Sequence, residues 1–166
     1  MSTNLRLFSK KLNTSKSCAF AFILPLPQVW GSANFSKSNS TSLVMSANNI
    51  LVWTDIPVTN LQRASRFYSA VLAKPVFEVP GMELSVLPNA DTGASGCLAV
   101  MKDNIPAQKG PLIYLSVEGR LNAAIEAVLS NGGDVIQPKE SIAPHGFRAV
   151  ILDSEGNRIA LHSQTE

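Results

Sequence analysis

The chain has 166 residues, of which 45% are hydrophobic and 16% charged, and its net charge is +2. This length and composition allow one domain with a buried core and exclude a chain that is disordered throughout. No apolar stretch reaches the roughly 18 residues of a transmembrane helix, so we expect no membrane-spanning segment.

The first 48 residues differ in composition from the rest. They contain five Lys/Arg residues and no acidic residue, whereas residues 49–166 contain nine Lys/Arg and twelve Asp/Glu residues. The larger part is therefore mildly acidic, which argues against a broad basic surface and against nucleic acid as a partner. We expect residues 1–48 to be a leader outside the fold and residues 49–166 to form the domain.

Three interpretations of this leader remain open. Its basic start, the apolar run from Cys18 to Leu26 and the small residues Gly31-Ser32-Ala33 are typical of a secretory signal. Its lack of acidic residues and its Ser, Arg and Lys content are typical of an organelle transit peptide. It could also be an untranslated or disordered extension, with the working protein beginning at Met45. The protein would be cytoplasmic in the last case and organelle-targeted or exported in the other two.

The first half of the domain predicts a strand, a helix and three short strands. Residues 49–58 alternate as in a strand, and Asn60 is a good N-cap for the helical apolar stripe that ends at Leu72. Pro75 prevents the helix from continuing far beyond that point. Short strands are then expected at 76–79, 83–87 and 96–102, separated by turn residues.

The second half repeats this order after a polar linker at 103–110. A strand is expected at 112–117, followed by a helical stripe over 121–129 that Gly132-Gly133 ends. Strands are predicted at 135–138, 147–152 and 158–162. The last two are joined by a tight turn in which Gly156 can adopt positive φ.

The repeated order predicts an α+β fold made of two βαβββ units, at about 49–102 and 111–163. Each unit alone would leave one face of a small sheet exposed. Together they can bury their helices outside and curl their sheets into a shared, mixed-sheet cup.

Two motifs carry a resemblance to a known family. They are Ile56-Pro57-Val58-Thr59-Asn60-Leu61 with Ala64 and Phe67-Tyr68 near the start, and Asp153-Ser154-Glu155-Gly156-Asn157-Arg158-Ile159 near the end. This pair resembles the opening and closing motifs of the vicinal-oxygen-chelate superfamily. That superfamily contains lactoylglutathione lyase (glyoxalase I), bleomycin-resistance proteins and extradiol dioxygenases. The resemblance implies the fold more than the activity, because one fold hosts many functions.

The same resemblance implies that the usual divalent metal site of this superfamily is missing. The positions of its ligands fall on Trp53, near Leu112, on Ala160 and within residues 97–100, where no carboxylate or imidazole stands. Metals that polarise a carbonyl require oxygen or nitrogen ligands. We therefore expect no cofactor, unless a divalent metal occupies a relocated site.

Strand alternation predicts what would line the cup if these positions face inward. Asp55 would share the face of Trp53. Tyr114 and Ser116 would share the face of Leu112. Arg158 and His162 would share the face of Ala160. The opposite, apolar set would pack under the helices: Val52, Ile56, Ile113, Leu115, Val117, Ile159 and Leu161. The prediction is a pocket with an aromatic wall (Trp53, Tyr114) and a polar end (Asp55, Arg158, His162).

The two histidines of the domain are the candidate catalytic residues. His145 and His162 could act as an acid/base pair, or join Asp55 or Glu155 in a new metal site. They could equally be an ordinary turn histidine and strand-end histidine. Arg158 could bind a substrate carboxylate or pair with Asp153 or Glu155 across the hairpin. A buried Asp55 would need a partner, for which Arg158 and His162 are candidates.

These observations lead to two function hypotheses. The first is a metal-free protein of the bleomycin-resistance type that binds a small oxygenated or aromatic molecule. The alternative is a lyase or isomerase related to lactoylglutathione lyase, with histidine-based chemistry or a relocated metal. A homodimer is common among similar proteins, so we include a second copy of the chain among the expected partners.

Overall fold

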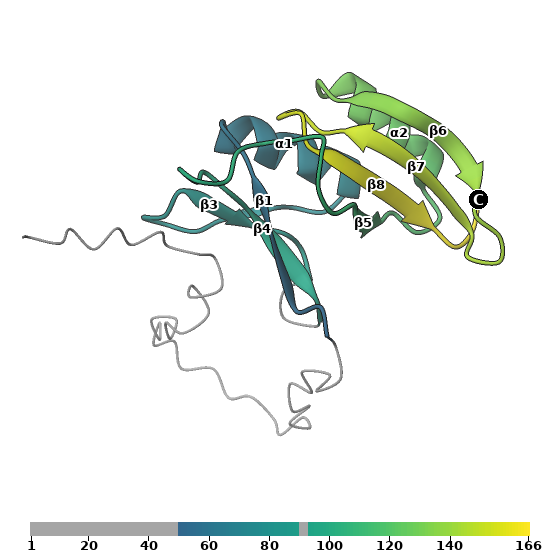
Figure 1. Ribbon diagram of the computed structural model, residues 1–166, viewed down its shortest axis with the longest axis horizontal. Coiled ribbons are helices and arrows are strands. Elements are labelled where there is room, and N and C mark those ends of the chain that lie inside the picture. Colours follow the sequence, from purple (N-terminus) through teal and green to yellow (C-terminus); the bar gives the residue numbers. More distant parts are fainter. Residues whose placement is uncertain (1–49, 90–92) are drawn as a thin grey trace, which may run out of the picture.

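The computed structural model of the chain describes residues 50–89 and 93–166, which contain two helices and two four-stranded sheets (Figure 1). The leader predicted at 1–48 lies outside the described residues. The first unit consists of β1 (Trp53–Pro57), α1 (Leu61–Leu72), β2 (Phe77–Glu78), β3 (Leu84–Val86) and β4 (Ser95–Ala99). The second consists of β5 (Ile113–Ser116), α2 (Leu121–Ser130), β6 (Asp134–Ser141), β7 (Phe147–Leu152) and β8 (Arg158–Ser163).

Both sheets have the same strand order, which confirms the predicted duplication. The order is β1-β4-β3-β2 in the first sheet and β5-β8-β7-β6 in the second. In each unit the first strand pairs with the fourth in parallel, and the other neighbours are antiparallel. The fold is therefore α+β with two open mixed sheets, and it is not a closed barrel.

One apolar core lies between the helices and the sheets of both units. Phe67, Tyr68 and Val71 from α1 meet Ala124 and Val128 from α2 in this core. The sheets contribute the residues predicted to pack under the helices, namely Ile56, Val117, Ile159 and Leu161, with Ile113 and Leu115 partly buried against them. The predicted strand register is therefore confirmed for these positions.

Most strands of the first unit are shorter than predicted, and β6 of the second unit is longer. Val52 was expected under the helices, but it precedes β1 and is 62% exposed, so this prediction is wrong. The pairing of β1 begins with Trp53 opposite Ser95, and no strand among residues 50–89 and 93–166 pairs with the residue before it. Strand β6 continues past Pro138 to Ser141, and it lies at a sheet edge, where a proline needs no ladder partner and register shifts are tolerated.

The turn between β7 and β8 joins the two units through Asp153. The Asp153 carboxylate is 2% exposed and accepts a 2.6 Å hydrogen bond from the Tyr68 hydroxyl of α1. It also accepts bonds from the backbone N–H groups of Glu155 and Asn157 within its own turn. Burial and the Asp153 carboxylate raise the pKa of Tyr68 well above its usual value, so the hydroxyl keeps its proton.

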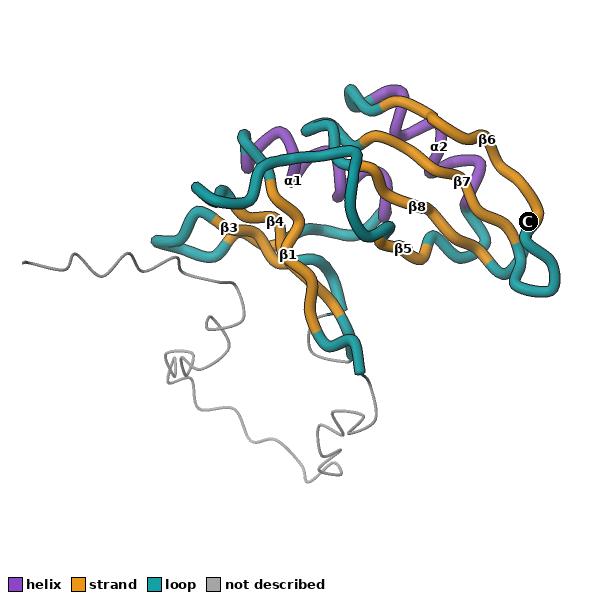
Figure 2. The backbone as a smooth tube through the Cα atoms, in the orientation of Figure 1, coloured by secondary structure: helices purple, strands orange, loops and turns teal. Residues whose placement is uncertain are grey.

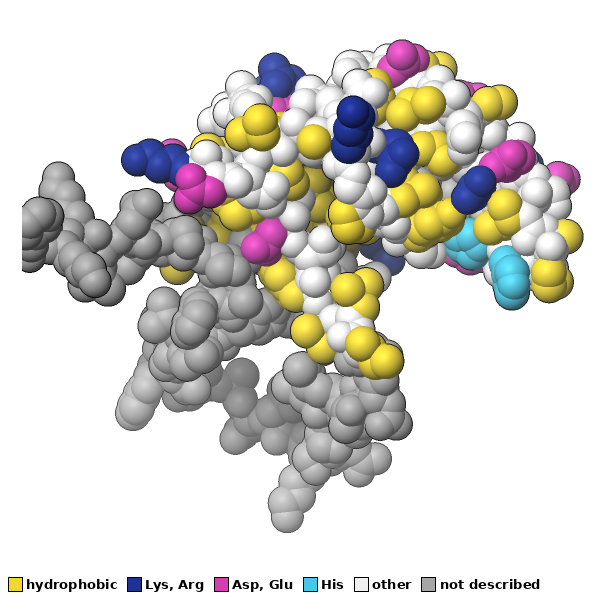
Figure 3. Space-filling model, viewed as in Figure 1, with side chains coloured by type: hydrophobic (Ala, Val, Ile, Leu, Met, Phe, Trp, Pro, Cys, Tyr) yellow, Lys and Arg dark blue, Asp and Glu magenta, His cyan; other side chains and the backbone are white. Residues whose placement is uncertain are grey.

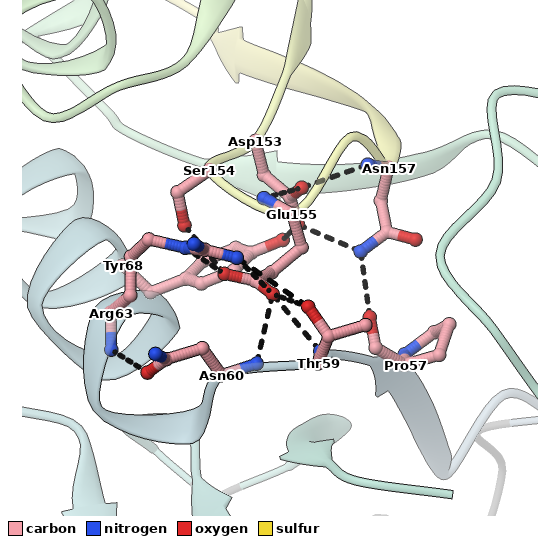
Figure 4. Close-up of polar contacts among 9 residues, drawn as sticks. All are labelled: Pro57, Thr59, Asn60, Arg63, Tyr68, Asp153, Ser154, Glu155 and Asn157. Atoms are coloured by element: carbon pink, nitrogen blue, oxygen red, sulfur yellow. Dashed lines mark hydrogen bonds and ion pairs between the residues drawn. The ribbon is translucent and has the colours of Figure 1, made fainter. Parts of the chain in front are cut away.

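Glu155, in the same turn, binds the start of α1 (Figure 4). Its carboxylate accepts hydrogen bonds from the Thr59 N–H and hydroxyl (2.9 and 2.7 Å), from the Asn60 N–H (3.0 Å) and from Arg63 Nε (2.7 Å). Burial alone would raise the pKa of Glu155, but the hydrogen bonds from Arg63, Thr59 and Asn60 outweigh it and lower the pKa to about 2. A carboxylate is also favoured by the positive end of the helix.

The linker between β4 and β5 is fixed to the start of β8 (Figure 2). The Asn157 side chain accepts a hydrogen bond from Ala107 N and donates one to the Pro57 carbonyl. Arg158 donates from its backbone N–H to Ala107 O and from Nη2 to Gly110 O. The linker thus connects both units across the beginning of the last strand.

Candidate functional site

The helix-free face of the second sheet carries a row of polar side chains. The register places Ser116, His162, Arg148 and Glu140 directly opposite one another on β5, β8, β7 and β6. Tyr114 lies two residues before Ser116 on β5, on the same face, and is paired with Ala160 of β8. Tyr114, Ser116 and His162 were predicted to share this face, and the strand pairing places them on it together.

Arg148 and Tyr114 connect strands that are not neighbours. Arg148 Nη1 donates a 2.6 Å hydrogen bond to the Tyr114 hydroxyl, and Nε donates a 2.8 Å bond to Glu140 Oε1. These contacts with Glu140 and Tyr114 raise the pKa of Arg148 above its already high usual value, so the guanidinium is charged. The site therefore holds a fixed positive charge with a phenol beside it.

His162 is oriented by the turn that contains the other histidine. Its Nε2 lies 2.7 Å from the backbone carbonyl oxygen of His145. A carbonyl only accepts hydrogen bonds, so Nε2 carries the proton and the lone pair of the neutral ring is on Nδ1. The His162 and Tyr114 rings meet edge to face, with centroids 6.5 Å apart. His145 contacts His162 through its backbone and not through its ring.

The helix-free face of the first sheet is apolar around one carboxylate. Trp53 Nε1 donates a 3.0 Å hydrogen bond to Asp55 Oδ1, and Cys97 Sγ lies 3.3 Å from the same oxygen. Around them lie Leu84 and Ala99, with Val79, Met82, Val86 and Met101 packed beside them. Neither Arg158 nor His162 is the partner of Asp55 in these contacts, which corrects the expected pairing.

Arg158 does not join Asp55 and His162 in one polar end. It stands at the start of β8 and His162 near its end, about 13 Å apart at the rise of an extended strand. Its Nη2 donates to the Gly110 carbonyl, so the alternative that paired Arg158 with Asp153 or Glu155 is not the contact found. Among the described residues, Arg158 Nε is buried without a hydrogen-bond partner.

Arg148 and Glu140 were not predicted to be site residues. The available signal was the charge of Arg148 in the otherwise apolar strand Phe147–Leu152. Figure 3 shows histidine side chains close to basic and acidic ones at the end of the molecule that the second unit forms.

A hollow of about 550 Å³ lies elsewhere, against α1. It is open, and the residues that line it are Gln62, Ser65, Arg66, Ser69, Glu78 and Asn131. None of these is a predicted site residue, so the predicted lining does not enclose this hollow.

The positions that the resemblance assigns to metal ligands do not fit a metal. Trp53 Nε1 is a donor engaged by Asp55, and position 160 carries only a methyl group, which is fully buried. Within residues 50–89 and 93–166, no group of three or more His, Cys, Asp or Glu residues could hold an ion. In the same part of the chain no helix is long and apolar enough to cross a membrane.

Comparison with solved structures identifies the fold. A glyoxalase/bleomycin resistance protein from Albidiferax ferrireducens T118 has a TM-score of 0.58 at 17% identity, covering 69% of this chain and 98% of that one. A glyoxalase-related enzyme from Fulvimarina pelagi has a TM-score of 0.52 at 18% identity, with 68% and 86% covered. A glyoxalase I mutant from Zea mays has a TM-score of 0.52 at 16% identity, and the match covers 68% of this chain and 46% of the maize chain.

These matches show that the chain has the fold of the vicinal-oxygen-chelate superfamily, as the sequence motifs indicated. No protein-family model matches the sequence, and no curated protein is significantly similar to it.

Proposed function

We propose that this protein binds a small oxygenated or aromatic molecule on the helix-free faces of its sheets, without the divalent metal of the superfamily's enzymes. The observation that carries the proposal is the row formed by Ser116, His162 and Arg148, with Tyr114 beside it. Three adjacent strands hold these side chains in fixed register, so hydrogen-bonding groups and aromatic surface are arranged before a ligand arrives.

The metal-free part of the proposal is supported by the chemistry of the available ligands. Trp53 and Ala160 supply no lone pair where the resemblance places metal ligands, and carbon atoms cannot replace the hydration shell of an ion. The positive charge on this face comes from Arg148 instead, and its hydrogen bonds to Glu140 and Tyr114 hold it in place.

A second copy of the chain is proposed to complete the site. Tyr114 on the edge strand β5 is 45% exposed in one chain, and Ile136 on β6, the opposite edge of the same sheet, is equally exposed. An apolar ring left half in water loses part of the free energy that burial provides. A partner surface over this face would bury both side chains and exclude water from the polar row.

The test is native mass spectrometry of the purified full-length protein, after exposure to Zn²⁺ or Ni²⁺ and desalting. We expect a dimer with no stoichiometric metal, and retained organic mass where the ligand copurifies. One ion per chain that resists desalting would contradict the metal-free proposal. A monomer at all concentrations would contradict the proposed second copy.

The alternative function is a lyase or isomerase, and the orientation of His162 favours it as the second candidate. The bond from Nε2 to His145 O leaves Nδ1 as the basic atom of the neutral ring. A base held in this way beside the Arg148 guanidinium could remove a proton next to a carbonyl group. Turnover of a bound ligand by the native protein, and its loss in His162→Gln, would support this function over simple binding.

A further inference from the structure

The row on the second sheet has a single fixed cation at its centre. Arg148 faces His162 on one side and Glu140 on the other. To reach the Tyr114 hydroxyl, its side chain must extend from β7 across β8 to β5. The residue of β8 beside Tyr114 is Ala160, whose methyl group is buried and leaves room for the guanidinium above the strand.

The contacts of Arg148 leave part of its binding capacity unused. Nε and Nη1 each make one hydrogen bond, to Glu140 and Tyr114. Among the residues that the structure describes, no other acceptor binds the remaining N–H groups. The side chain is 29% exposed, so a small molecule can reach it. A guanidinium fork of this kind matches the two oxygens of a carboxylate.

Glu140 is bound only weakly to this fork. Its side chain is 47% exposed, and ion pairs in such surroundings contribute little to stability. A ligand carboxylate with two oxygens in line with the fork would make stronger bonds than this single Glu140 contact. A ligand carboxylate can therefore displace Glu140 from the Arg148 guanidinium.

We propose that the ligand of this face carries a carboxylate, which displaces Glu140 and binds Arg148, while its unsaturated or aromatic body lies against Tyr114 and His162. This inference rests on the binding function proposed above and specifies its ligand class. The Tyr114 ring, with the His162 ring edge to face against it, supplies aromatic surface beside the charge.

The test uses benzoate as the probe and benzamide as its uncharged isostere, each titrated into the full chain and followed by isothermal calorimetry. The native protein is expected to bind benzoate more tightly than benzamide. Arg148→Gln should weaken benzoate binding about tenfold or more, since charge-assisted bonds are lost. Glu140→Gln should tighten it by about threefold, because the competing carboxylate is gone.

Two further variants show whether benzoate binds at Arg148 or at another arginine of the surface. Tyr114→Phe keeps the ring and removes only the hydroxyl that positions Arg148, so it should weaken benzoate binding less than Arg148→Gln does. Arg66→Gln changes an arginine that lines the hollow against α1 and should leave benzoate binding unchanged. Melting curves of each variant show whether it is folded.

The outcomes distinguish this inference from the proposed function. Equal binding of benzoate and benzamide that is insensitive to Arg148→Gln would overturn the carboxylate inference and leave the binding function standing. Loss of benzoate binding in Arg66→Gln would place the anion in the hollow and overturn the inference as well. No benzoate binding to the native chain would also overturn it, whereas the binding function is judged by native mass spectrometry.

Discussion

The Tyr68 hydroxyl and the Asp153 carboxylate, 85 positions apart in the sequence, form a 2.6 Å hydrogen bond inside the core that both units share. Tyr68 comes from the first unit and Asp153 from the closing turn of the second. Because both groups are buried, neither can exchange the bond for one to water. This bond and the Glu155 contacts beside it hold the two units in a fixed relation (Figure 4).

Replacing Tyr68 by Phe should destabilise the protein by about 1–3 kcal/mol, because a buried carboxylate oxygen loses its hydroxyl donor. Urea unfolding of the full chain followed by circular dichroism measures this change. Tyr114→Phe is the matched control, since it removes a hydroxyl with a similar bond from an exposed ring, and it should cost less. Equal losses of unfolding free energy in both variants would show that burial does not strengthen the contribution of the Tyr68–Asp153 bond to stability.

Regular elements whose pattern reflects burial were predictable from sequence. The helix from Leu61 to Leu72 and the strand from Phe147 to Leu152 have the bounds that their apolar spacing indicated. The pattern failed where burial depends on a neighbouring strand. Val52 alternates correctly with Trp53, but within the described part of the chain the strand pairing begins only at Trp53, and Val52 is exposed. Alternation defines the face of a residue only within the length that is paired.

The site was only partly predictable for a related reason. Alternation placed Tyr114 and His162 on the correct face, but it could not show that Arg148 reaches Tyr114 across the strand between them. That contact depends on register and on strand order. Arg158 and His162 of β8 were candidate partners of Asp55, yet Asp55 lies in the other sheet and accepts a hydrogen bond from Trp53.

Glu155 predicts a specific loss of stability in acid. Its pKa is about 2 in the folded protein and near its ordinary value of 4.5 in the unfolded chain. The folded state therefore releases this proton more readily, so the stabilisation is complete above about pH 4.5 and is lost as the pH falls toward 2. Urea midpoints measured at pH 6, 4 and 3 should fall in this order.

The variant Glu155→Gln should have a lower midpoint at pH 6 and a weaker decline below it. Glu118, whose pKa is lowered by bonds from the backbone of Gln164 and from Thr165, contributes in the same direction and remains in this variant. The difference between the native protein and Glu155→Gln therefore isolates Glu155. Parallel pH profiles for the two proteins would contradict this assignment.

Gly133 should tolerate no side chain, because a Cβ atom there would lie 2.5 Å from the Leu152 carbonyl oxygen, 2.7 Å from Phe67 and 2.8 Å from Val128. Backbone and core atoms on three sides cannot all move away. Gly133→Ala should therefore destabilise the protein by about 1–3 kcal/mol. Gly93→Ala is the control, since no atom lies within 4 Å of its Cβ position. An unchanged urea midpoint for Gly133→Ala would show that the packing between the end of α2 and β7 leaves room for a methyl group.

The hydrogen bond from His162 Nε2 to the His145 carbonyl predicts the tautomer of the ring. In long-range ¹⁵N–¹H correlation spectra at alkaline pH, where imidazole rings are neutral, His162 should show protonated Nε2 and unprotonated Nδ1. The opposite tautomer would remove the basis for assigning Nδ1 as a base.

His162→Gln then separates positioning from chemistry, because its side-chain amide can still donate to the His145 carbonyl but cannot act as a base. Its unfolding midpoint should stay close to that of the native protein, whereas His162→Ala loses the bond and should be less stable. A ligand bound by His162→Gln with native affinity but no longer converted would identify Nδ1 as the catalytic base. Unchanged conversion would exclude His162 from the chemistry and leave its ring as part of the binding surface.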